Sequence, residues 1–348
     1  MPVAAQAFDI PIRETPMLIM SRTPLRVSFF GGGTDYPEYF RAPGMRGAVV
    51  GMAINKYIYI GALRIDGIQS YRYRVSYSQI ERVDAVPEIQ HNVVRAGLQH
   101  FGWDNPLDIS VMSDMPASTG LGSSSSFTVG FINLLSRLSK QTITKLDLAR
   151  QATRLEHDVL QERVGVQDQL HAAFGGINRF DFDAKGTRIQ PLAMTGICQS
   201  ALTASLLLIY TGTTRHASAT LDEQIEKTKS RRIDRELGSL LAMVDEAMTI
   251  LEGEDPDRLL RDFGRMMHEG WLVKKSLSSR ISQPHIDELY DNAMSHGATG
   301  GKLCGAGGGG FLLMVVPPQA RQRVIAAVRP AKCIDLALDT EGSTILYS

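Results

Sequence analysis

Hydrophobic positions near the middle of the chain recur at the spacing of a helix, directly after a segment rich in glycine and serine. Apolar residues three or four positions apart predict a helix with one buried face. These residues are Phe127, Phe131, Leu134, Leu135 and Leu138. The pattern therefore predicts a helix that begins among the serines of the stretch Met115–Gly130.

Gly120 and Gly122 precede this helix and let the backbone come close to a ligand. Ser123–Ser126 then offer hydroxyl groups of the kind that cap helix N-termini. A helix N-terminus presents free N–H groups and the positive end of a dipole, which suit an anionic phosphate. We interpret the segment as a phosphate-binding loop; the alternative is a capped helix after a Gly-Ser loop. It is neither a Walker loop, because no lysine follows the last glycine, nor a GxGxxG segment.

Runs of β-branched and aromatic residues in the first part of the chain predict strands. We expect a short strand at Leu25–Phe30 and a long strand at Val49–Leu63. The alternating segment Tyr71–Ser78 is a candidate to pair with the long strand as a hairpin. A helix is predicted at His91–Phe101, and Leu107–Met112 is expected to be the strand that leads into the phosphate loop.

Three glycines, Gly31–Gly33, end the first of these strands and allow a sharp turn. The turn brings Asp35 close to a ligand, or else Asp35 caps the turn with its own side chain. The residues leave both interpretations open. Arg22 and Arg26 flank the strand, and either is placed to face a phosphate.

Two acidic residues follow the phosphate loop. A capping pattern at Thr144 starts a helix that is expected to run to about Leu160. Within it, Glu156 points toward the apolar face, where a carboxylate needs a cation or a metal. Asp168 lies farther on. The alternatives are an ion pair with an arginine for Glu156 and a helix cap for Asp168, but two acids after a phosphate loop favour magnesium-assisted phosphoryl transfer.

The second part of the chain follows a predicted hairpin at Ile177–Ile189 and a shift in composition near Pro191–Ser200, where we place a domain boundary. It is expected to contain strands and helices at Ala204–Tyr210, Ala219–Leu251 (broken near Arg232), Pro256–Leu277, His285–His296, Thr299–Leu303, Phe311–Val316, Pro318–Val328 and Lys332–Leu338. This order resembles a split βαβ sheet with helices on one face. The run Gly305–Gly310 is richer in glycine than a hairpin needs, which favours close approach to the phosphate loop or substrate over a flexible turn.

Composition narrows the class of protein. The 348 residues are 43% hydrophobic and 21% charged, as in a globular protein with a large core. Basic and acidic residues are equal at 37 each, so no net charge favours nucleic acid or a membrane surface. The three cysteines fit reduced thiols, and the histidines lack metal-site spacing.

We therefore expect a cytoplasmic protein that is a monomer or a homodimer. Met1–Pro16 lacks the basic start and apolar run of a signal peptide, and no stretch is long enough to cross a bilayer. The expected organisation is a flexible tail over residues 1–16, a first domain over 17–195 and a second over 196–348.

Three glycine-rich segments, in this order, resemble the three motifs of the GHMP kinases, the superfamily of galactokinase, homoserine kinase, mevalonate kinase and phosphomevalonate kinase. They are Arg22–Tyr36, Pro116–Ser124 and Gly305–Leu312, and they span nearly the whole chain. The resemblance implies an α+β fold of two domains, ribosomal-protein-S5-like at the N-terminus and ferredoxin-like at the C-terminus, with the active site in the cleft between them. It also implies a kinase that uses ATP and Mg²⁺.

Within this family the sequence resembles the sugar 1-kinases that act on D-glycero-D-manno-heptose 7-phosphate. Gly31–Tyr36, Tyr210–Arg215 and Gly300–Gly307 carry this narrower resemblance. Galactokinases have an acid and a histidine where Gly32 and Gly33 stand, which argues against galactose as the substrate. The alternatives are a fucokinase- or galactokinase-like kinase of an unphosphorylated sugar and a catalytically silent sensor of the same fold.

The resemblance implies a role for each matching residue. Asp168 would be the base for the sugar hydroxyl, with Arg26 beside the transferred phosphoryl group, and Ser124 and Glu156 would hold Mg²⁺. The ATP phosphates would lie against Pro116, Gly120, Leu121, Gly122, Ser123, Ser124 and Ser125. The acceptor would lie against Gly32, Gly33, Thr34, Asp35, Tyr36, Arg215, Gly307 and Gly308. An acceptor phosphate needs its own cationic clamp, for which Arg215 is the leading candidate, ahead of Lys274 and Lys275.

Overall fold

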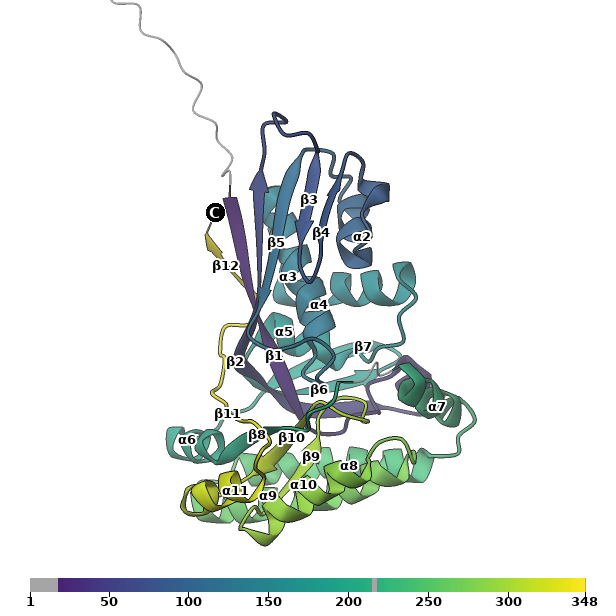
Figure 1. The fold of residues 1–348 in the computed structure, drawn as a ribbon. Coiled ribbons are helices and arrows are strands. Elements are labelled where there is room, and N and C mark those ends of the chain that lie inside the picture. Colours follow the sequence, from purple (N-terminus) through teal and green to yellow (C-terminus); the bar gives the residue numbers. More distant parts are fainter. Residues whose placement is uncertain (1–17, 215–217, 348) are drawn as a thin grey trace, which may run out of the picture.

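The computed structural model describes residues 18–214 and 218–347, so the predicted tail over residues 1–16 and Arg215 lie outside the described residues. The described residues form two sheets with helices packed on them (Figure 1). This arrangement confirms the predicted α+β class.

The larger sheet has eight strands, six of which follow one another in a hydrogen-bonded path. In their order across the sheet these are β12 (Thr344–Tyr347), β1 (Leu18–Phe30), β2 (Gly47–Arg64), β5 (Leu107–Ser113), β3 (Tyr73–Ser76) and β4 (Ile80–Val83). The hairpin of β6 (Ile177–Asp183) and β7 (Gly186–Pro191) joins the sheet through β2. Strand β1 is longer than the sequence predicted and ends at Phe30, immediately before the three glycines.

The long strand β2 organises this sheet because its two halves pair with different strands. It pairs with β1 along its length, while Gly47–Met52 also pairs with β6 and Ile58–Arg64 with β5. The prediction that Tyr71–Ser78 pairs with β2 as a hairpin is wrong. The edge of β2 is occupied by β5, and β3 instead pairs with β5 in parallel and with β4 in antiparallel orientation.

Within the described residues, five α-helices lie between strands of this sheet along the chain, and the third of them begins directly after the phosphate loop. They are α1 (Pro37–Phe40), α2 (Asn92–His100), α3 (Ser123–Leu138), α4 (Lys145–Arg154) and α5 (Gln167–Phe174). The apolar face predicted for α3 is buried against β1 and β2, and α4 and α5 pack beside it. Helix α4 begins at Thr144, whose side chain accepts a hydrogen bond from the backbone of Asp147 as the capping pattern predicts, and it continues as a π-helical turn over Leu155–Val159.

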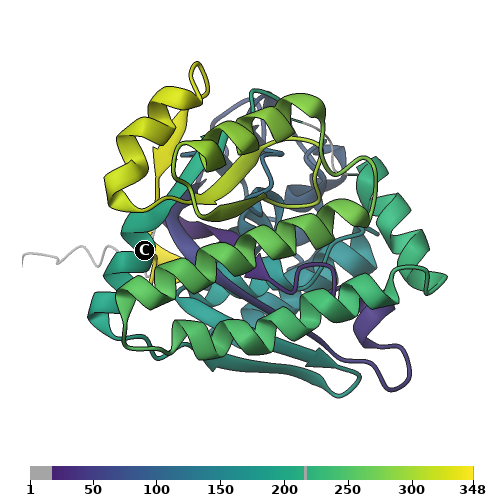
Figure 2. The same cartoon turned by 90° about the horizontal axis from the view of Figure 1, so that it is seen from below.

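The second group of elements contains the smaller sheet, with antiparallel neighbours in the order β11-β8-β10-β9. In chain order, this second group of elements consists of α6 (Gly196–Ser205), β8 (Leu206–Tyr210), α7 (Ser218–Lys229), α8 (Asp234–Leu251), α9 (Pro256–Ser276), α10 (Pro284–Ser295), β9 (Gly300–Leu303), β10 (Phe311–Val315), α11 (Arg321–Ala327) and β11 (Cys333–Asp335). This order agrees with the split βαβ arrangement expected from the sequence. In Figure 2 the long helices α8 and α9 lie side by side across the face seen from below. In the described part of the chain, no helix combines the length and the apolar character needed to cross a bilayer.

Helix α9 also packs against the end of β1. The ring of Phe263 meets Phe29 and Phe30 edge-on, with ring centroids 5.1 and 5.5 Å apart. Such aromatic contacts between buried rings hold the end of β1, and the glycine turn after it, against the second group of elements. The division of the chain at residue 195, between β7 and α6, stays a prediction.

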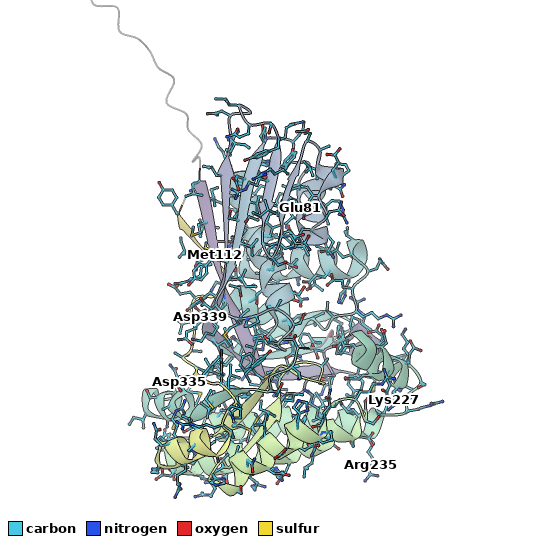
Figure 3. The ribbon with its side chains drawn as sticks, viewed as in Figure 1. Glu81, Met112, Lys227, Arg235, Asp335 and Asp339 are labelled. Carbon is cyan, nitrogen blue, oxygen red and sulfur yellow. The ribbon has the colours of Figure 1, made fainter. Side chains whose placement is uncertain are left out.

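The last strand returns to the first sheet, which the sequence did not predict. In Figure 1, β12 (yellow) lies beside β1 (purple), with which it pairs at Met20–Arg22. Asp339, labelled in Figure 3, accepts hydrogen bonds from the backbone N–H of Gly342 at 2.7 Å and from the hydroxyl of Tyr57 at 3.1 Å. The hydroxyl groups of Thr23 and Ser343 are 2.8 Å apart. These contacts guide the chain onto the free edge of β1.

Candidate active site

A cavity of about 280 Å³ lies where the two groups of elements meet. The first group contributes the end of β1 with its glycine turn, the phosphate loop and the start of α5. The second contributes α9, β9 and the loop between β9 and β10. Predicted site residues that line it are Arg26, Gly32, Gly33, Asp35, Tyr36, Gly120, Gly122, Ser123, Ser124, Asp168, Lys274 and Gly307.

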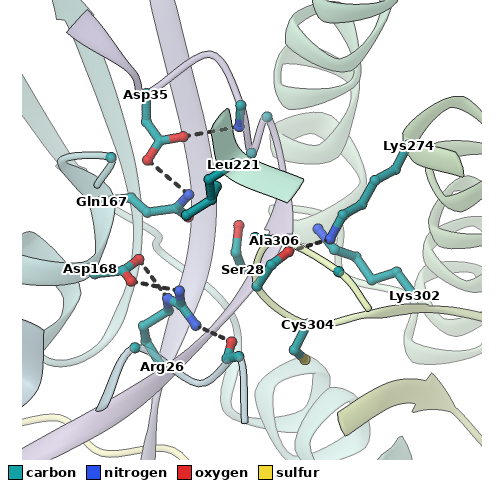
Figure 4. A pocket seen from close by; sticks show the side chains of 18 of the residues that line it. Arg26, Ser28, Asp35, Gln167, Asp168, Leu221, Lys274, Lys302, Cys304 and Ala306 are labelled. Carbon is teal, nitrogen blue, oxygen red and sulfur yellow. Dashed lines mark hydrogen bonds and ion pairs between the residues drawn. The ribbon is translucent and has the colours of Figure 1, made fainter. Parts of the chain in front are cut away.

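Arg26 and Asp168 face each other in this cavity and form a bidentate ion pair (Figure 4). The Nε and Nη2 atoms of Arg26 donate to the two carboxylate oxygens of Asp168 at 2.8 and 2.7 Å. Its Nη1 donates to the carbonyl oxygen of Gly120 at 2.6 Å. Burial lowers the pKa of Arg26, but the charge and hydrogen bonds of Asp168 outweigh burial and the pKa is raised. One guanidinium group thus connects the predicted base to the phosphate loop.

Asp35 is almost completely buried in the wall of the cavity. Its carboxylate accepts hydrogen bonds from the backbone N–H of Gly33 and from the side chain of Gln167, both at 3.0 Å. Burial raises the pKa of Asp35, the negative charge of Asp168 raises it further, and the two hydrogen bonds lower it. Asp35 therefore braces the glycine turn, as the capping interpretation expected, and it also lines the cavity, where its contact with a ligand stays a prediction. Gln167, which precedes Asp168, was missed as a site residue.

The phosphate loop leads into α3 without a side-chain cap. Gly122 is the N-cap residue, with a left-handed backbone (φ 75°), and no side chain in the described part of the chain caps the helix there. The expectation that the serines cap this helix is therefore wrong. The hydroxyl of Ser126 donates to the carbonyl of Pro24, and that of Ser125 donates to Glu156. The first N–H groups of α3 consequently have no capping oxygen, which is the arrangement that suits an anionic ligand.

Several of the residues predicted to bind ATP, the acceptor or Mg²⁺ do not line the cavity. Leu121 is buried, and its carbonyl accepts the backbone N–H of Arg26 at 3.0 Å. The hydroxyl of Thr34 donates to the carbonyls of Gly31 and Ala48 at 2.8 and 2.9 Å, so it stabilises the glycine turn from behind. The residues in the predicted set that do not line the cavity are Pro116, Leu121, Ser125, Thr34, Glu156 and Gly308.

Glu156 lies behind the phosphate loop, in the π-helical turn that extends α4, and is fully buried. Its Oε2 atom accepts hydrogen bonds from Ser125, at 3.1 Å, and from Gln169. Its Oε1 atom has no hydrogen-bond partner among residues 18–214 and 218–347. Burial raises the pKa of Glu156 to about 7, against the lowering effect of its hydrogen bonds. The structure thus ties Glu156 to Ser125, whereas the neighbouring Ser124 is exposed at the cavity.

The third glycine-rich segment packs directly against the phosphate loop, as the sequence suggested. A Cβ atom on Gly120, whose φ is +81°, would lie 2.5 Å from the carbonyl oxygen of Cys304. No side chain fits at such a distance without moving one of the two backbones. At the other end of the segment, a Cβ atom on Gly310, whose φ is +101°, would lie 2.3 Å from the carbonyl oxygen of Thr119 in the phosphate loop. The two loops therefore hold each other in place.

We expect Gly120→Ala to lower the free energy of unfolding by about 1–3 kcal/mol more than a matched control, because the methyl group overpacks this contact. The control is Gly44→Ala, which has a similar φ of +73° but nothing within 4 Å of the added atom. Chemical denaturation of the two variants measures the difference. Equal losses of stability would show that backbone strain alone, and not the loop contact, fixes glycine at position 120.

The candidates for the cationic clamp of an acceptor phosphate differ in their positions. Lys274 lines the cavity, as does Lys302, which the sequence analysis missed although it stands directly after Gly300 and Gly301. Lys275 points elsewhere and pairs with Asp287 at 3.3 Å. Arg215 lies outside the described residues.

Similarity to known proteins agrees with this geometry. The chain is 30% identical to D-glycero-alpha-D-manno-heptose 7-phosphate kinase of Campylobacter jejuni over 332 residues, which cover 89% of this chain and 93% of the relative. It is 25% identical to galactokinase of Pyrococcus furiosus, with 83% of this chain and 86% of the relative covered.

Solved structures show the same fold. A D-glycero-D-manno-heptose 1-phosphate kinase from Bacteroides thetaiotaomicron superposes with a TM-score of 0.69 at 23% identity, over 95% of this chain and all of that chain. Lactococcus lactis galactokinase complexed with galactose gives a TM-score of 0.71 at 17% identity, over 95% of each chain. Family models of the GHMP kinases N terminal domain and of the GHMP kinases C terminal match residues 89–176 and 257–335. The chain belongs to the GHMP kinases, which transfer a phosphoryl group from ATP to an alcohol group of their substrate.

Proposed function

We propose that the protein transfers the γ-phosphoryl group of ATP to the anomeric hydroxyl of D-glycero-D-manno-heptose 7-phosphate, giving the 1,7-bisphosphate. The observation that carries the proposal is the bidentate pair of Arg26 and Asp168, which stands in the cavity beside the phosphate loop. The choice of acceptor is supported by the similarity to the Campylobacter jejuni enzyme and by Gly32 and Gly33, which line the cavity at the positions where galactokinases have an acid and a histidine.

In this proposal Asp168 accepts the proton of the anomeric hydroxyl as that oxygen bonds to the γ-phosphorus. The bond between this phosphorus and the bridging oxygen breaks, and ADP leaves with the electron pair. Arg26 orients the carboxylate of Asp168 and stabilises the charge of the transferred group. The backbone N–H groups of Gly120–Ser124 bind the ATP phosphates, and Asp35 accepts hydrogen bonds from sugar hydroxyls. Catalysis of phosphoryl transfer requires this combination of positioning and charge compensation.

Glu156 and Ser124 would hold Mg²⁺. The fit rests on the fully buried Oε1 atom of Glu156, which lacks a partner among the described residues, and on ligand chemistry, because carboxylate and hydroxyl oxygens are ligands that Mg²⁺ prefers. When bound, the ion neutralises negative charge on the phosphates. Ser125 and Gln169 fix the other carboxylate oxygen, Oε2, and so orient Glu156 toward the cation.

We expect Glu156→Gln to raise the Mg²⁺ concentration needed for half-maximal rate. The same change should raise the melting temperature of the metal-free protein at pH 8. The folded pKa of about 7 exceeds the ordinary value of 4.5, so the folded state loses stability as the pH rises through this window, and glutamine removes that cost. The gain should shrink toward pH 5.

The control for this prediction is Asp158→Asn, which removes an exposed acid from the same turn. It should leave the Mg²⁺ requirement and the pH dependence of melting as in the wild type. A metal-free Glu156→Gln protein that melts earlier than wild type at pH 8, with an unchanged Mg²⁺ requirement, would instead make Glu156 a structural hydrogen-bond partner.

The proposed function is tested by ADP release from Mg-ATP with a panel of acceptors. The panel contains D-glycero-D-manno-heptose 7-phosphate, the unphosphorylated heptose, fucose, galactose and mannose, and NMR of the product locates the new phosphate. The heptose 7-phosphate should give the highest kcat/KM, with the phosphate on the anomeric oxygen. A higher kcat/KM for an unphosphorylated sugar would replace the proposal with a fucokinase- or galactokinase-like activity, and no turnover with any acceptor would favour the silent sensor.

A further inference from the structure

Two lysines from the second group of elements point into the cavity (Figure 4). Lys274 comes from the last turns of α9, and its Nζ atom donates to the carbonyl oxygens of Leu303 and Gly305 at 2.8 and 2.6 Å. Lys302 comes from β9, is 9% exposed, and donates to the carbonyl oxygen of Phe29 at 2.9 Å. Both ammonium groups are thus held by backbone carbonyls.

Neither lysine has a carboxylate partner within the described ranges 18–214 and 218–347. The two acids that line the cavity are already used, since Asp168 pairs with Arg26 and Asp35 accepts from Gly33 and Gln167. Burial, and then the charge of Lys302, lowers the pKa of Lys274 to about 7, and burial lowers the pKa of Lys302 to about 8. A buried cation without an anion is costly, so an anionic ligand at this point stabilises both charges.

The positions of the lysines indicate which phosphate they meet. The donor phosphates already have the N–H groups of the phosphate loop and Arg26, and in Figure 4 Arg26 lies across the cavity from Lys274 and Lys302. Lys302 is bonded to Phe29, two residues before the glycine turn that leads to Asp35. Lys274 lies one turn of α9 before Leu277, which lines the cavity together with Leu221 of α7. Lys302 is therefore placed at the acceptor's side of the cavity, while Lys274 lies between that side and Gly305, which packs against Gly120 of the phosphate loop.

We propose that Lys274 and Lys302 form the subsite for the phosphate group that the acceptor already carries. The inference rests on the proposed function, because only a phosphorylated acceptor needs such a subsite. Two ammonium groups on separate elements can each donate to different phosphate oxygens, and charge-assisted hydrogen bonds of this kind are strong. The subsite distinguishes a sugar phosphate from the same sugar without its phosphate.

The test compares Lys274→Met and Lys302→Met with the control Lys275→Met, because methionine keeps an apolar stem of similar length and removes the charge. Initial rates give KM for heptose 7-phosphate, for the unphosphorylated heptose and for ATP. We expect each active-site variant to raise KM for heptose 7-phosphate at least about tenfold, while KM for the unphosphorylated heptose and for ATP changes less than about twofold. Lys275→Met should match wild type. Lys302→Arg, which keeps the charge, should restore part of the affinity.

A rise in KM for ATP, or equal losses with both acceptors, would overturn the proposal and assign the lysines to the donor phosphates or to folding. Melting temperatures of all variants separate a folding defect from a binding defect, and Lys274→Met carries the test alone if Lys302→Met does not fold.

Calorimetric titration of heptose 7-phosphate, in the presence of ADP and Mg²⁺, shows whether the subsite proposal or the proposed function has failed. Lysine-dependent binding without turnover would reject the function and keep the subsite. Turnover of heptose 7-phosphate that is indifferent to both lysines would keep the function and reject the subsite.

Discussion

Asp168→Asn should lower kcat at least about a hundredfold, the lower end of the range for a lost general base. The variant should keep its fold and its affinity for ATP, because Asp168 is bonded to Arg26, and it is Arg26 that donates to Gly120 of the phosphate loop. Asparagine can still accept one of the two hydrogen bonds from Arg26, but it cannot take a proton from the sugar hydroxyl. Single-turnover rates with saturating Mg-ATP, together with a nucleotide-binding titration, measure both parts of the expectation.

The matched control is Asp108→Asn. Asp108 accepts from Arg74 at 2.8 Å, so this change breaks an ion pair of the same length in the same sheet but away from the cavity. It should leave kcat unchanged. Near-normal turnover in a folded Asp168→Asn protein would remove Asp168 from the role of base and leave positioning and charge compensation as the whole mechanism.

The second large effect is expected for Arg26→Met, with a fall in kcat of about a hundredfold to a thousandfold, as when a preorganised donor to transition-state charge is removed. Arg26 is 6% exposed, and its three donors reach both oxygens of Asp168 and the carbonyl of Gly120. Arg26→Lys should recover only part of the rate, because an ammonium group cannot make two parallel bonds to one carboxylate.

The pH profile of kcat/KM shows how Arg26 acts. Loss of a neighbouring positive charge disfavours the charged form of a carboxylate, so the acidic limb of the profile should move to higher pH in Arg26→Met and less in Arg26→Lys. Arg74→Met, which breaks the control pair, should leave the profile in place. A large loss of rate in Arg26→Met with an unmoved acidic limb would mean that Arg26 acts on the phosphoryl group alone.

Much of the fold could be predicted because its signals are local. The apolar spacing from Phe127 to Leu138 predicts α3, and the capping pattern at Thr144 predicts the start of α4. The pairing of strands was harder to predict, because it depends on which edge of each strand is still free. The pattern of Tyr71–Ser78 shows an alternating strand but cannot show that β5 already occupies the edge of β2.

The residues of the site also differ in how far local sequence signals could predict them. Arg26 and Asp35 stand in the first glycine-rich motif and Asp168 follows Glu156 along the chain, and the structure brings Arg26, Asp35 and Asp168 together at one cavity. Gln167 stands next to Asp168, and Lys302 stands in the segment Gly300–Gly307, but their chemistry depends on burial and on partners from distant segments. The N-cap of α3 was predicted to be a serine side chain, whereas a left-handed glycine lets the chain enter the helix and leaves the serine hydroxyls to Pro24 and Glu156.

The return of the chain to β1 has a consequence for biosynthesis. Thr23, in β1, and Ser343, next to β12, are 320 residues apart, yet their side chains share a hydrogen bond. During translation β1 therefore leaves the ribosome long before its partner exists, and the outer edge of the first sheet stays open. Open strand edges invite pairing with other chains. The nascent chain consequently depends on the synthesis of residues 344–347 to complete its first sheet, and a ribosome stalled before them displays an aggregation-prone edge.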